Sequence, residues 1–316
     1  MTKPEIVLLA TPAWEDYELL DSGQGARLER YGPYTFVRPE HQAVWQRVLP
    51  SGRWEAAHAI FQPTGEESGG RWQVNKPVKT PWQMRYRLAK QAELRFLAFT
   101  ANSRHMGVFP EQAAHWDWMS AHITTHITRH VEVGQTPVKV LNLFGYTGLA
   151  TLAAAGSGAH VTHVDASKKS ILIARENQNL SGLSDRPVRW LVDDAFKFVR
   201  KEIRRGSRYD AIVLDPPKFG RGPQGQVWEF FESLPELLQN CRLLLSDRPL
   251  FVVLTAYAIR SSALSIYYAM QEMVTGLGGR LETGELALVE RSAGRLLSTA
   301  IFARWGSDEQ TGSHQD

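Results

Sequence analysis

The chain has 316 residues, 43% of them apolar, and a formal net charge of +3. This length and apolar content predict a globular protein of two domains. The single cysteine, Cys241, excludes an internal disulfide and a cysteine-based metal cluster, which favours a reducing, cytoplasmic environment. The apolar run at residues 6–10 is too short for a membrane span, so we expect no membrane partner.

The first hundred residues differ in composition from the rest of the chain. Turn signals such as Ser-Gly and Gly-Pro separate short stretches of aromatic and branched residues, which is typical of small β domains. We predict a β-rich, substrate-binding domain over residues 1–104 and a connecting segment over 105–135. A second domain is predicted over 136–305, followed by a disordered polar tail over 306–316.

Positive charge gathers at the end of the first predicted domain. Residues 71–104 hold eight basic residues against one acid, Glu93, with aromatic residues between them. This composition is typical of a surface that binds phosphates and stacks nucleobases. A solvated strand face with its aromatic residues turned inward fits the alternation in residues 84–88 equally well. The basic residues are Arg71, Lys76, Lys79, Arg85, Arg87, Lys90, Arg95 and Arg104, and the aromatic residues are Trp72, Trp82, Tyr86, Phe96 and Phe99.

Three histidines recur at a spacing of four residues in the connecting segment: His122, His126 and His130. This spacing would place metal ligands on one side of a helix, but no carboxylate ligand lies near them. We therefore expect a polar helix face and no metal. Trp116 and Met119 are spaced to pack together on one face of the same helix.

The stretch that carries the chemistry is residues 139–159, KVLNLFGYTGLATLAAAGSGA. An apolar run of strand length passes into a segment rich in Leu and Ala, which predicts a strand, a tight turn and a helix. Gly145 and Gly148 let the backbone approach a ligand closely, and the free N–H groups at the helix N-terminus are donors. The turn is suited to a nucleotide-like cofactor.

A second predicted strand, residues 160–165, ends in Asp165, near the spacing at which doubly wound folds place a ribose-binding carboxylate. The turn before it has only two glycines, so the dinucleotide-binding pattern is incomplete and no tight pyrophosphate loop is expected. S-adenosylmethionine has no pyrophosphate. The turn and the acid therefore favour this cofactor over the alternative, a strand crossover without a ligand.

A third predicted strand, residues 188–192, is followed by Asp193 and Asp194. Acids at the carboxyl end of a strand lie where an adenine amino group would be recognised. The alternative is an N-cap for the helix that follows, which accounts for one of these acids but less readily for both.

The fourth predicted strand, residues 209–214, leads to Asp215, Pro216 and Pro217. Two consecutive prolines supply no N–H and fix φ, so this loop is rigid. We expect Asp215 and the Pro216 carbonyl to accept hydrogen bonds from an amine or a nucleobase and to hold a nitrogen in line with a methyl donor. Taken alone, the motif fits a proline turn capped by aspartate equally well.

The remaining patterns complete an α/β domain. A loop that acts as a lid is predicted over residues 220–225, a fifth strand over 251–255, and an antiparallel pair over 285–289 and 296–303. The predicted fold class is α/β, with a seven-stranded, mostly parallel Rossmann-like domain and a smaller N-terminal β-rich domain.

These motifs, in their order and spacing, resemble the class I S-adenosylmethionine-dependent methyltransferases that modify bases of large-subunit ribosomal RNA. The resemblance rests on VLNLFGYTG, VTHVDAS, AREN, DDAFKF and VLDPPKF, and it covers about residues 105–257. It implies a class I methyltransferase domain, S-adenosylmethionine as cofactor, and RNA such as rRNA as substrate. The cofactor-binding residues that it implies are Asn142, Phe144, Gly145, Tyr146, Thr147, Gly148, Asp165, Ala166, Ser167, Asn177, Asp193, Asp194, Ala195 and Asp215, and the catalytic residues are Asp215, Pro216, Pro217 and Lys218.

The sequence departs from the family pattern in two places. An Asp-Gln-Arg triplet that helps to bind the cofactor reads EQA at residues 111–113, which makes Gln112 and His115 candidates for contacting the cofactor's carboxylate. Family members that methylate cytosine C5 carry a nucleophilic cysteine just after the fifth strand, where this chain has LTAY at residues 254–257. Cys241 lies in an apolar stretch that is typical of a structural thiol.

The leading hypothesis is methylation of a nucleobase in RNA, such as rRNA, at a nitrogen, because no thiol is placed to activate a pyrimidine carbon. Methylation of a protein or a small molecule is the alternative within enzymes. The alternative from another class is a non-catalytic RNA-binding protein that retains a cofactor fold, and the rigid loop at Asp215 argues against it. The sequence predicts no oligomeric state.

Overall fold

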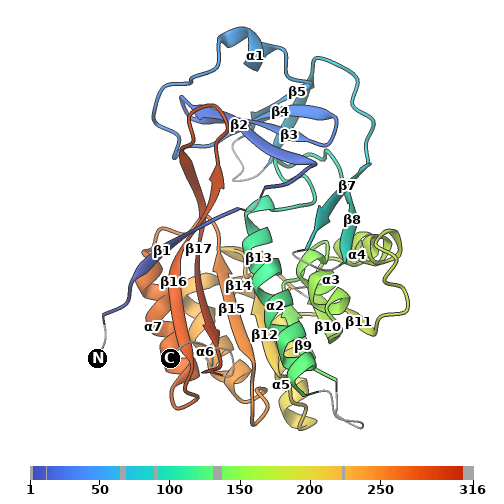
Figure 1. The fold of residues 1–316 in the computed structure, drawn as a ribbon, viewed down its shortest axis with the longest axis vertical. Helices are drawn as coiled ribbons and strands as arrows, with labels where there is room; N and C mark the ends of the chain where they lie inside the picture. Colours follow the sequence, from blue (N-terminus) through green and yellow to red (C-terminus); the bar gives the residue numbers. More distant parts are fainter. Residues whose placement is uncertain are drawn as a thin grey trace.

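An eight-stranded sheet forms the larger part of the molecule (Figure 1). The computed structural model describes residues 3–11, 13–64, 69–88, 92–130, 137–222 and 225–308. The strand order is β1-β16-β17-β15-β12-β9-β10-β11, and β17 runs antiparallel to both of its neighbours while the other pairs are parallel. The strands are β1 (Ile6–Ala10), β9 (Lys139–Leu143), β10 (His160–Asp165), β11 (Val188–Val192), β12 (Ala211–Leu214), β15 (Phe251–Ala256), β16 (Arg280–Val289) and β17 (Leu296–Gly306).

The predicted α/β fold is confirmed, but the sheet has one strand more than the seven predicted. The extra strand is β1, whose residues were assigned to the N-terminal domain by composition; it pairs in parallel with β16, with Ile6 opposite Thr283 and Ala10 opposite Ala287. Ile6 and Leu8 are exposed, as on the edge of a sheet. A short aliphatic run can pair with any free strand edge, so the sequence pattern alone does not identify its partner.

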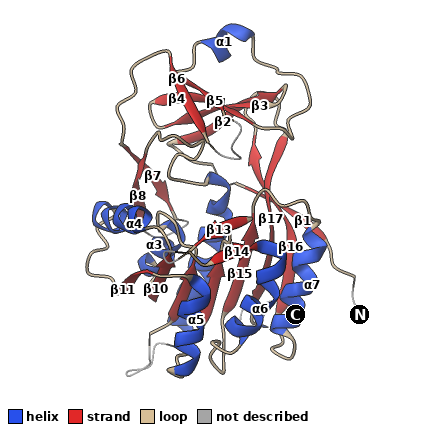
Figure 2. Ribbon diagram, turned by 180° about the vertical axis from the view of Figure 1, so that it is seen from behind, coloured by secondary structure: helices blue, strands red, loops and turns tan. Residues whose placement is uncertain are grey.

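Helices cover both faces of the large sheet (Figure 2). α2, α3 and α4 lie on one face, and α5, α6 and α7 lie on the other. The segment expected to connect two domains is part of the larger one, because α2 buries Trp116, Met119 and Ile123 in the core. The helices are α2 (Ala113–Arg129), α3 (Leu149–Gly156), α4 (Lys168–Leu180), α5 (Ala195–Arg204), α6 (Phe230–Arg242) and α7 (Ala263–Val274), with a 3-10 turn η1 (Pro110–Gln112) before α2.

A five-stranded sheet in the order β2-β3-β4-β5-β6 forms the smaller part (Figure 1). Gly25 (φ +75°) and Gly32 (φ +57°) make the tight turns around β3, in the left-handed region that favours glycine. A separate hairpin, β7-β8, contacts α4 of the larger part. These elements are β2 (Tyr17–Gly23), β3 (Ala26–Tyr31), β4 (Tyr34–Pro39), α1 (Ser51–Glu55), β5 (Ala59–Pro63), β6 (Gly70–Val74), β7 (Trp82–Arg87) and β8 (Glu93–Ala98).

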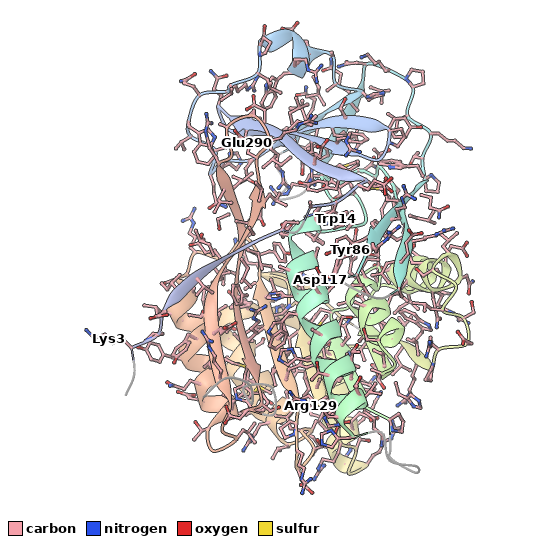
Figure 3. The ribbon with its side chains drawn as sticks, viewed as in Figure 1. Lys3, Trp14, Tyr86, Asp117, Arg129 and Glu290 are labelled. Carbon is pink, nitrogen blue, oxygen red and sulfur yellow. The ribbon has the colours of Figure 1, made fainter. Side chains whose placement is uncertain are left out.

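The two parts share one hydrophobic core. The ring of Trp14 lies 4.7 Å from that of Tyr86 and 5.9 Å from that of Trp116, measured between centroids. The hydroxyl of Tyr86 donates a hydrogen bond of 2.6 Å to Asp117 on α2 (Figure 3). Aromatic pairs of this kind each contribute about 0.5–1.5 kcal/mol beyond their buried area. The β7-β8 hairpin and the segment before β2 are therefore held against α2.

The turn between β16 and β17 reaches the N-terminal sheet at a second place (Figure 3). Glu290, which is 1% exposed, accepts a hydrogen bond from Ser22 on β2. Ser292 donates to Asp21 on the same strand at 2.6 Å. Because these contacts join residues about 270 positions apart, the long hairpin couples the smaller sheet to the edge of the larger one.

The predicted lid at residues 220–225 is partly a small hairpin, in which β13 (Phe219–Arg221) pairs with β14 (Val227–Glu229). Residues 223–224, and 309–316 of the predicted tail, lie outside the described residues. No helix in the described part of the chain has the length and apolar content needed to cross a membrane. The cytoplasmic location stays a prediction.

Candidate active site

The turn between β9 and α3 adopts the predicted strand-turn-helix geometry. Phe144, Tyr146 and Gly148 all have positive φ angles, of 58°, 48° and 87°. Gly145 cannot carry a side chain here, because a Cβ atom would lie 2.3 Å from the ring of the buried His163. The backbone of the turn therefore packs directly against the buried imidazole of His163, a close approach that only glycine allows.

Asp165 ends β10 and lies against this turn. Its two carboxyl oxygens accept hydrogen bonds from the backbone N–H groups of Tyr146, at 2.9 Å, and Ser167, at 2.8 Å. Burial raises the pKa of Asp165, and these two hydrogen bonds act in the opposite direction. Each oxygen keeps a lone pair that can accept a further hydrogen bond.

Asp215 directly follows β12. Burial raises the pKa of Asp215 to about 8, and the negative charges of Glu111 and Asp165 add to the shift. Gln112 on η1 donates from Nε2 to Oδ2 of Asp215 at 3.2 Å, and this hydrogen bond partly offsets the rise in the pKa of Asp215. The carboxyl group is therefore held in place and exchanges its proton near neutral pH.

The two prolines after Asp215 are braced by the small hairpin. Trp228 on β14 donates from Nε1 to the carbonyl oxygen of Pro217 at 2.5 Å, and its ring packs against Phe144 at 5.1 Å. The strand that follows the predicted lid thus supports the proline loop from the side. This contact adds to the stiffness that consecutive prolines already give the loop.

Most of the predicted site residues open onto a large cleft or onto a small recess next to it. A cavity of about 690 Å³ lies between the N-terminal sheet and the carboxyl ends of β10 and β12, and a recess of about 50 Å³ lies beside the glycine turn. The predicted residues that line them are Gln112, Asn142, Phe144, Gly145, Tyr146, Thr147, Asp165, Ala166, Ser167, Asp215, Pro216, Pro217 and Lys218. The predicted residues that line neither are His115, Gly148, Asn177, Asp193, Asp194 and Ala195.

Asn177 and His115 were predicted to contact the cofactor, but the structure places both among other protein groups. Asn177 accepts from the backbone N–H of Leu97 and donates to the carbonyl of Thr147, both at 2.9 Å, so it braces the glycine turn against β8. His115 is 1% exposed, and its ring packs against Phe302 at 5.1 Å. Burial lowers the pKa of His115 to about 3, so the imidazole is neutral. Neither side chain lines the cleft or the recess.

Asp193 and Asp194 follow β11, the strand next to β10. The backbone N–H of Asp193 donates to the carbonyl of Asp165 at 3.2 Å, so the ends of these strands adjoin. Asp193 forms an ion pair with Lys201 at 2.7 Å. Asp194 caps α5 by accepting from the backbone N–H of Lys197 at 2.9 Å. The N-cap alternative is confirmed for Asp194, whereas Asp193 remains beside Asp165.

Two sets of cleft residues were not assigned from the sequence. The first is Glu111 on η1 with Arg27 and Arg38 of the N-terminal sheet, which line the same cavity as Asp215. Burial raises the pKa of Glu111, and the positive charges of the two arginines limit that shift. The arginines are far from every motif in the sequence, so no local signal connects them with the site.

The second is Tyr257, which directly follows β15 and lines the cleft. Its ring packs against Phe109 at 5.0 Å. Burial, followed by the charges of Glu111 and Asp215, raises the pKa of Tyr257 well above its ordinary value, so its hydroxyl stays protonated. Cys241 is buried in α6 and lines neither the cleft nor the recess.

The basic stretch at residues 71–104 shows the alternation of a strand with one solvated face. Trp82, Tyr86 and Phe96 are buried, so the prediction that they stack on nucleobases is wrong. Glu93 forms ion pairs of 3.7 and 2.8 Å with two of the basic residues. Lys90 lies outside the described residues. The tertiary fold thus uses these aromatic residues as core.

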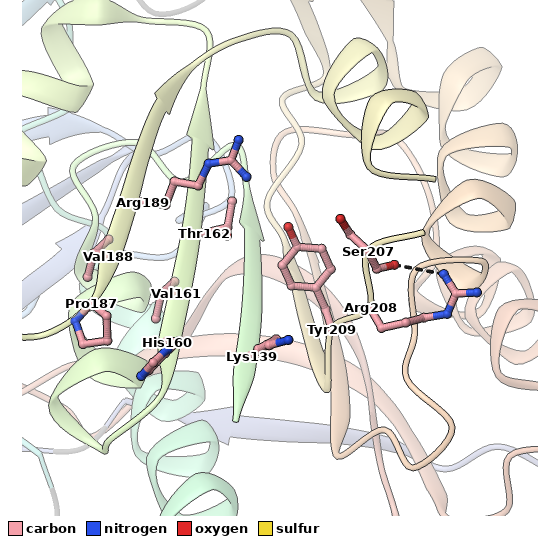
Figure 4. A pocket seen from close by; sticks show the side chains of 10 residues that line it. All are labelled: Lys139, His160, Val161, Thr162, Pro187, Val188, Arg189, Ser207, Arg208 and Tyr209. Carbon is pink, nitrogen blue, oxygen red and sulfur yellow. Dashed lines mark hydrogen bonds between the residues drawn. The ribbon is translucent and has the colours of Figure 1, made fainter. Parts of the chain in front are cut away.

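A second cavity, of about 460 Å³, lies where β9, β10 and β11 begin, at the opposite edge of the sheet (Figure 4). Lys139, Arg189 and Arg208 line it together with Tyr209, whose hydroxyl donates to Glu202 at 3.0 Å. It contains none of the predicted site residues, and ligands of such sheets bind at the carboxyl ends of the strands. The cleft is therefore the better candidate for the reaction.

Comparison with known proteins identifies the class to which this fold and site belong. Residues 122–258 match the family model of the S-adenosylmethionine-dependent methyltransferases. The crystal structure of a SAM-dependent methyltransferase from Agrobacterium tumefaciens is 44% identical, with 97% of each chain covered and a TM-score of 0.86. The chain belongs to the S-adenosylmethionine-dependent methyltransferases, and S-adenosylmethionine is its cofactor.

Similarity to curated relatives is confined to a shorter stretch. The ribosomal RNA large subunit methyltransferase I of Klebsiella pneumoniae (strain 342) is 44% identical over 82 residues, which are 26% of this chain and 20% of that protein. The protein of the same name from Aeromonas hydrophila subsp. hydrophila is 38% identical over 105 residues, 33% of this chain and 24% of that protein. The match spans about a fifth to a quarter of these relatives.

Proposed function

We propose that this methyltransferase modifies a nitrogen of a nucleobase in RNA, such as ribosomal RNA. The observation that carries the proposal is the position of Asp215, which faces the large cleft beside the glycine turn. The cleft volume of about 690 Å³ falls within the range of cavities that enclose small organic ligands, so a nucleotide is of suitable size. The partial similarity to ribosomal RNA methyltransferases supports RNA as the source of that nucleotide.

The residues proposed to hold the cofactor surround the recess and the adjoining strand ends. The backbone of residues 144–147 is proposed to contact the methionine end of the cofactor, since these residues line the recess. Asp165 is proposed to accept hydrogen bonds from the ribose hydroxyls with its remaining lone pairs. Asp193, which lies beside Asp165, is proposed to face the adenine. Gln112 is proposed to reach the carboxylate of the cofactor.

S-adenosylmethionine supplies a methyl group that is already activated on its sulfonium sulfur. The protein has to align the target nitrogen with that methyl carbon and keep water away, and we assign the alignment to Asp215 and the Pro216 carbonyl. As the N–C bond forms and the C–S bond breaks, S-adenosylhomocysteine leaves and the nitrogen loses a proton. We assign its acceptance to Asp215 or Glu111, which both line the cleft, and the cofactor's positive charge favours their ionised form.

Tyr257 supports nitrogen over carbon as the target. Methylation at a pyrimidine C5 needs a covalent adduct with a thiolate, and a protonated phenol is no substitute for that nucleophile. The raised pKa keeps Tyr257 protonated, and the one cysteine of the chain lies in α6. A nitrogen atom has its own lone pair and needs no such activation.

We propose the N-terminal sheet as the substrate-binding part, with a domain boundary near residue 104. The sheet covers the cleft and contributes positive side chains to it. The cationic residues that line the cleft are Arg27, Arg38, Arg104, Lys218 and Arg221. A protein or a small molecule remains the alternative substrate, whereas membership of an enzyme family disfavours a non-catalytic RNA-binding role.

The proposed function is tested by transfer of tritiated methyl groups onto separate pools of RNA and protein. We expect the label in RNA, and mass spectrometry of the digested RNA is expected to find an N-methylated nucleoside. Label that appears in protein alone would show that the substrate class is wrong. A 5-methylcytosine product would show that the target atom is wrong.

Asp165→Ala is expected to weaken S-adenosylmethionine binding by about 1–3 kcal/mol, because a shielded pair of ribose hydroxyls would lose its acceptor. Titration calorimetry measures this change. The matched control is Asp210→Ala, since Asp210 also accepts a backbone N–H, that of Lys139 at 2.8 Å, but at the amino ends of the strands. Equal affinity of the two variants for the cofactor would contradict the assignment of Asp165.

A further inference from the structure

Two arginines of the N-terminal sheet face the cleft as direct neighbours. Arg27 on β3 is paired with Arg38 on β4 in the register of the sheet, and both side chains line the cavity that Asp215 lines. Like charges directly opposite each other on a sheet are unfavourable unless anions compensate them. The anions around this pair are Glu29 and Glu40.

Arg38 is fully engaged with other groups of the N-terminal part. It donates to both carboxyl oxygens of Glu29 at 2.7 Å, to the hydroxyl of Tyr31 at 2.6 Å and to the carbonyl of Arg104 at 2.8 Å. Its side chain is 4% exposed. Because all three of its side-chain nitrogens already donate, Arg38 has a structural role in holding together the part of the N-terminal sheet that lines the cleft.

Arg27 has the same chemistry but much looser contacts. Its Nε atom lies 3.3 Å from Glu29, and its Nη1 atom lies 3.7 Å from Glu40. Within the described residues its buried Nε has no hydrogen-bond partner, although the side chain is only 13% exposed. Leaving a shielded donor of a charged group unpaired is costly. The buried Nε faces Glu29, and the long contact to Glu40 leaves the Nη groups of Arg27, which lines the cleft, able to donate to an anionic ligand.

We propose that Arg27 binds a phosphate group of the RNA nucleotide whose base reaches Asp215, an inference that rests on the proposed function. The planar guanidinium offers parallel N–H donors that match two phosphate oxygens, and such charge-assisted pairs are stronger than neutral hydrogen bonds. Arg104, Lys218 and Arg221 line the same cleft and add to its positive potential. The N-terminal sheet thus contributes directly to the substrate site.

The test measures binding of a single-stranded 12-nucleotide RNA of mixed sequence by fluorescence anisotropy at several salt concentrations. Arg27→Gln is expected to lower RNA affinity about tenfold and to flatten the slope of log K against log salt by about 0.7, the value for one lost phosphate contact on single strands. Arg27→Lys keeps the charge, so we expect it to retain most of that slope while binding more weakly. Cofactor affinity, measured by calorimetry, is expected to stay unchanged and shows that each variant is folded.

Arg30→Gln is the matched control, because Arg30 is on the same strand but does not line the cleft. Its guanidinium donates to Glu18 at 2.9 Å and to the carbonyls of Gly32 and Glu15. We expect RNA affinity and salt slope of this variant to equal those of the wild type. If the wild type binds RNA and Arg27→Gln matches it in affinity and slope, the assignment of Arg27 is wrong while the proposed function stands. If the wild type does not bind RNA, both the assignment of Arg27 and the proposed function are wrong.

Discussion

Asp215→Ala is expected to lower kcat by about 100- to 1,000-fold while cofactor affinity changes less than about threefold. The carboxyl group orients the target nitrogen and is a candidate proton acceptor, contributions that are made mainly in the transition state. Methyl transfer to the identified RNA, measured with saturating cofactor, gives kcat, and calorimetry gives the affinity for S-adenosylmethionine. A loss of cofactor binding equal to the loss of turnover would assign Asp215 to the cofactor instead.

Asp210→Ala is the control for this experiment, because Asp210 and Asp215 lie at the two ends of β12 (Ala211–Leu214). Asp210 accepts the backbone N–H of Lys139 at the edge of the sheet away from the cleft. We expect its replacement to leave kcat within about threefold of the wild type. A large loss in both variants would indicate damage to the strand and not a specific effect at the site.

Asp215→Asn is expected to stabilise the cofactor-free protein by a few kcal/mol above pH 8. The pKa of Asp215 is about 8 in the folded chain against an ordinary value of 3.8, so folding takes up a proton between these values. The free energy of unfolding contributed by Asp215 therefore falls as the pH rises from about 4 to 8. Asparagine has nearly the same shape, keeps an acceptor for Gln112 and removes this cost.

Thermal unfolding at pH 5, 7 and 9 measures the effect. The difference in Tm between Asp215→Asn and the wild type is expected to increase with pH and to level off above pH 8. Asp210→Asn is expected to show no such trend. A Tm difference that is constant across the range would mean that Asp215 does not take up a proton on folding.

The carboxylates of the site could be predicted because their signal is local. Asp165 and Asp215 each follow a run of strand length, and parallel strands bring their carboxyl ends to one edge of the sheet. The same rule applied to β15 points to Tyr257, which was named from the sequence only as the last residue of LTAY and was not assigned to the site. Asn177 shows the limit of motif matching, since a residue within a matching motif braces the turn and lines neither the cleft nor the recess.

Arg27 could not be predicted in the same way, because it reaches the cleft through the packing of a separate sheet. Its distance along the chain from Asp215 carries no periodic pattern that would connect them. The prediction that the aromatic residues between 71 and 104 stack on nucleobases failed for a related reason. Composition does not show which side of a strand faces the core. Tyr86 is buried against Trp14 and against Trp116 of α2, whereas Trp82 is buried against Tyr34 and Phe36 of β4.

The pairing of β1 (Ile6–Ala10) with β16 (Arg280–Val289) has a consequence for how the chain is made. Its two strands are separated by about 270 residues, so at typical synthesis rates of about 5–20 residues per second β1 waits roughly 14–54 s for its partner. During that interval an aliphatic segment has no partner and is available to chaperones or to other nascent chains. The large sheet therefore closes only after nearly all of the described chain has left the ribosome, and contacts of such sequence separation fold slowly.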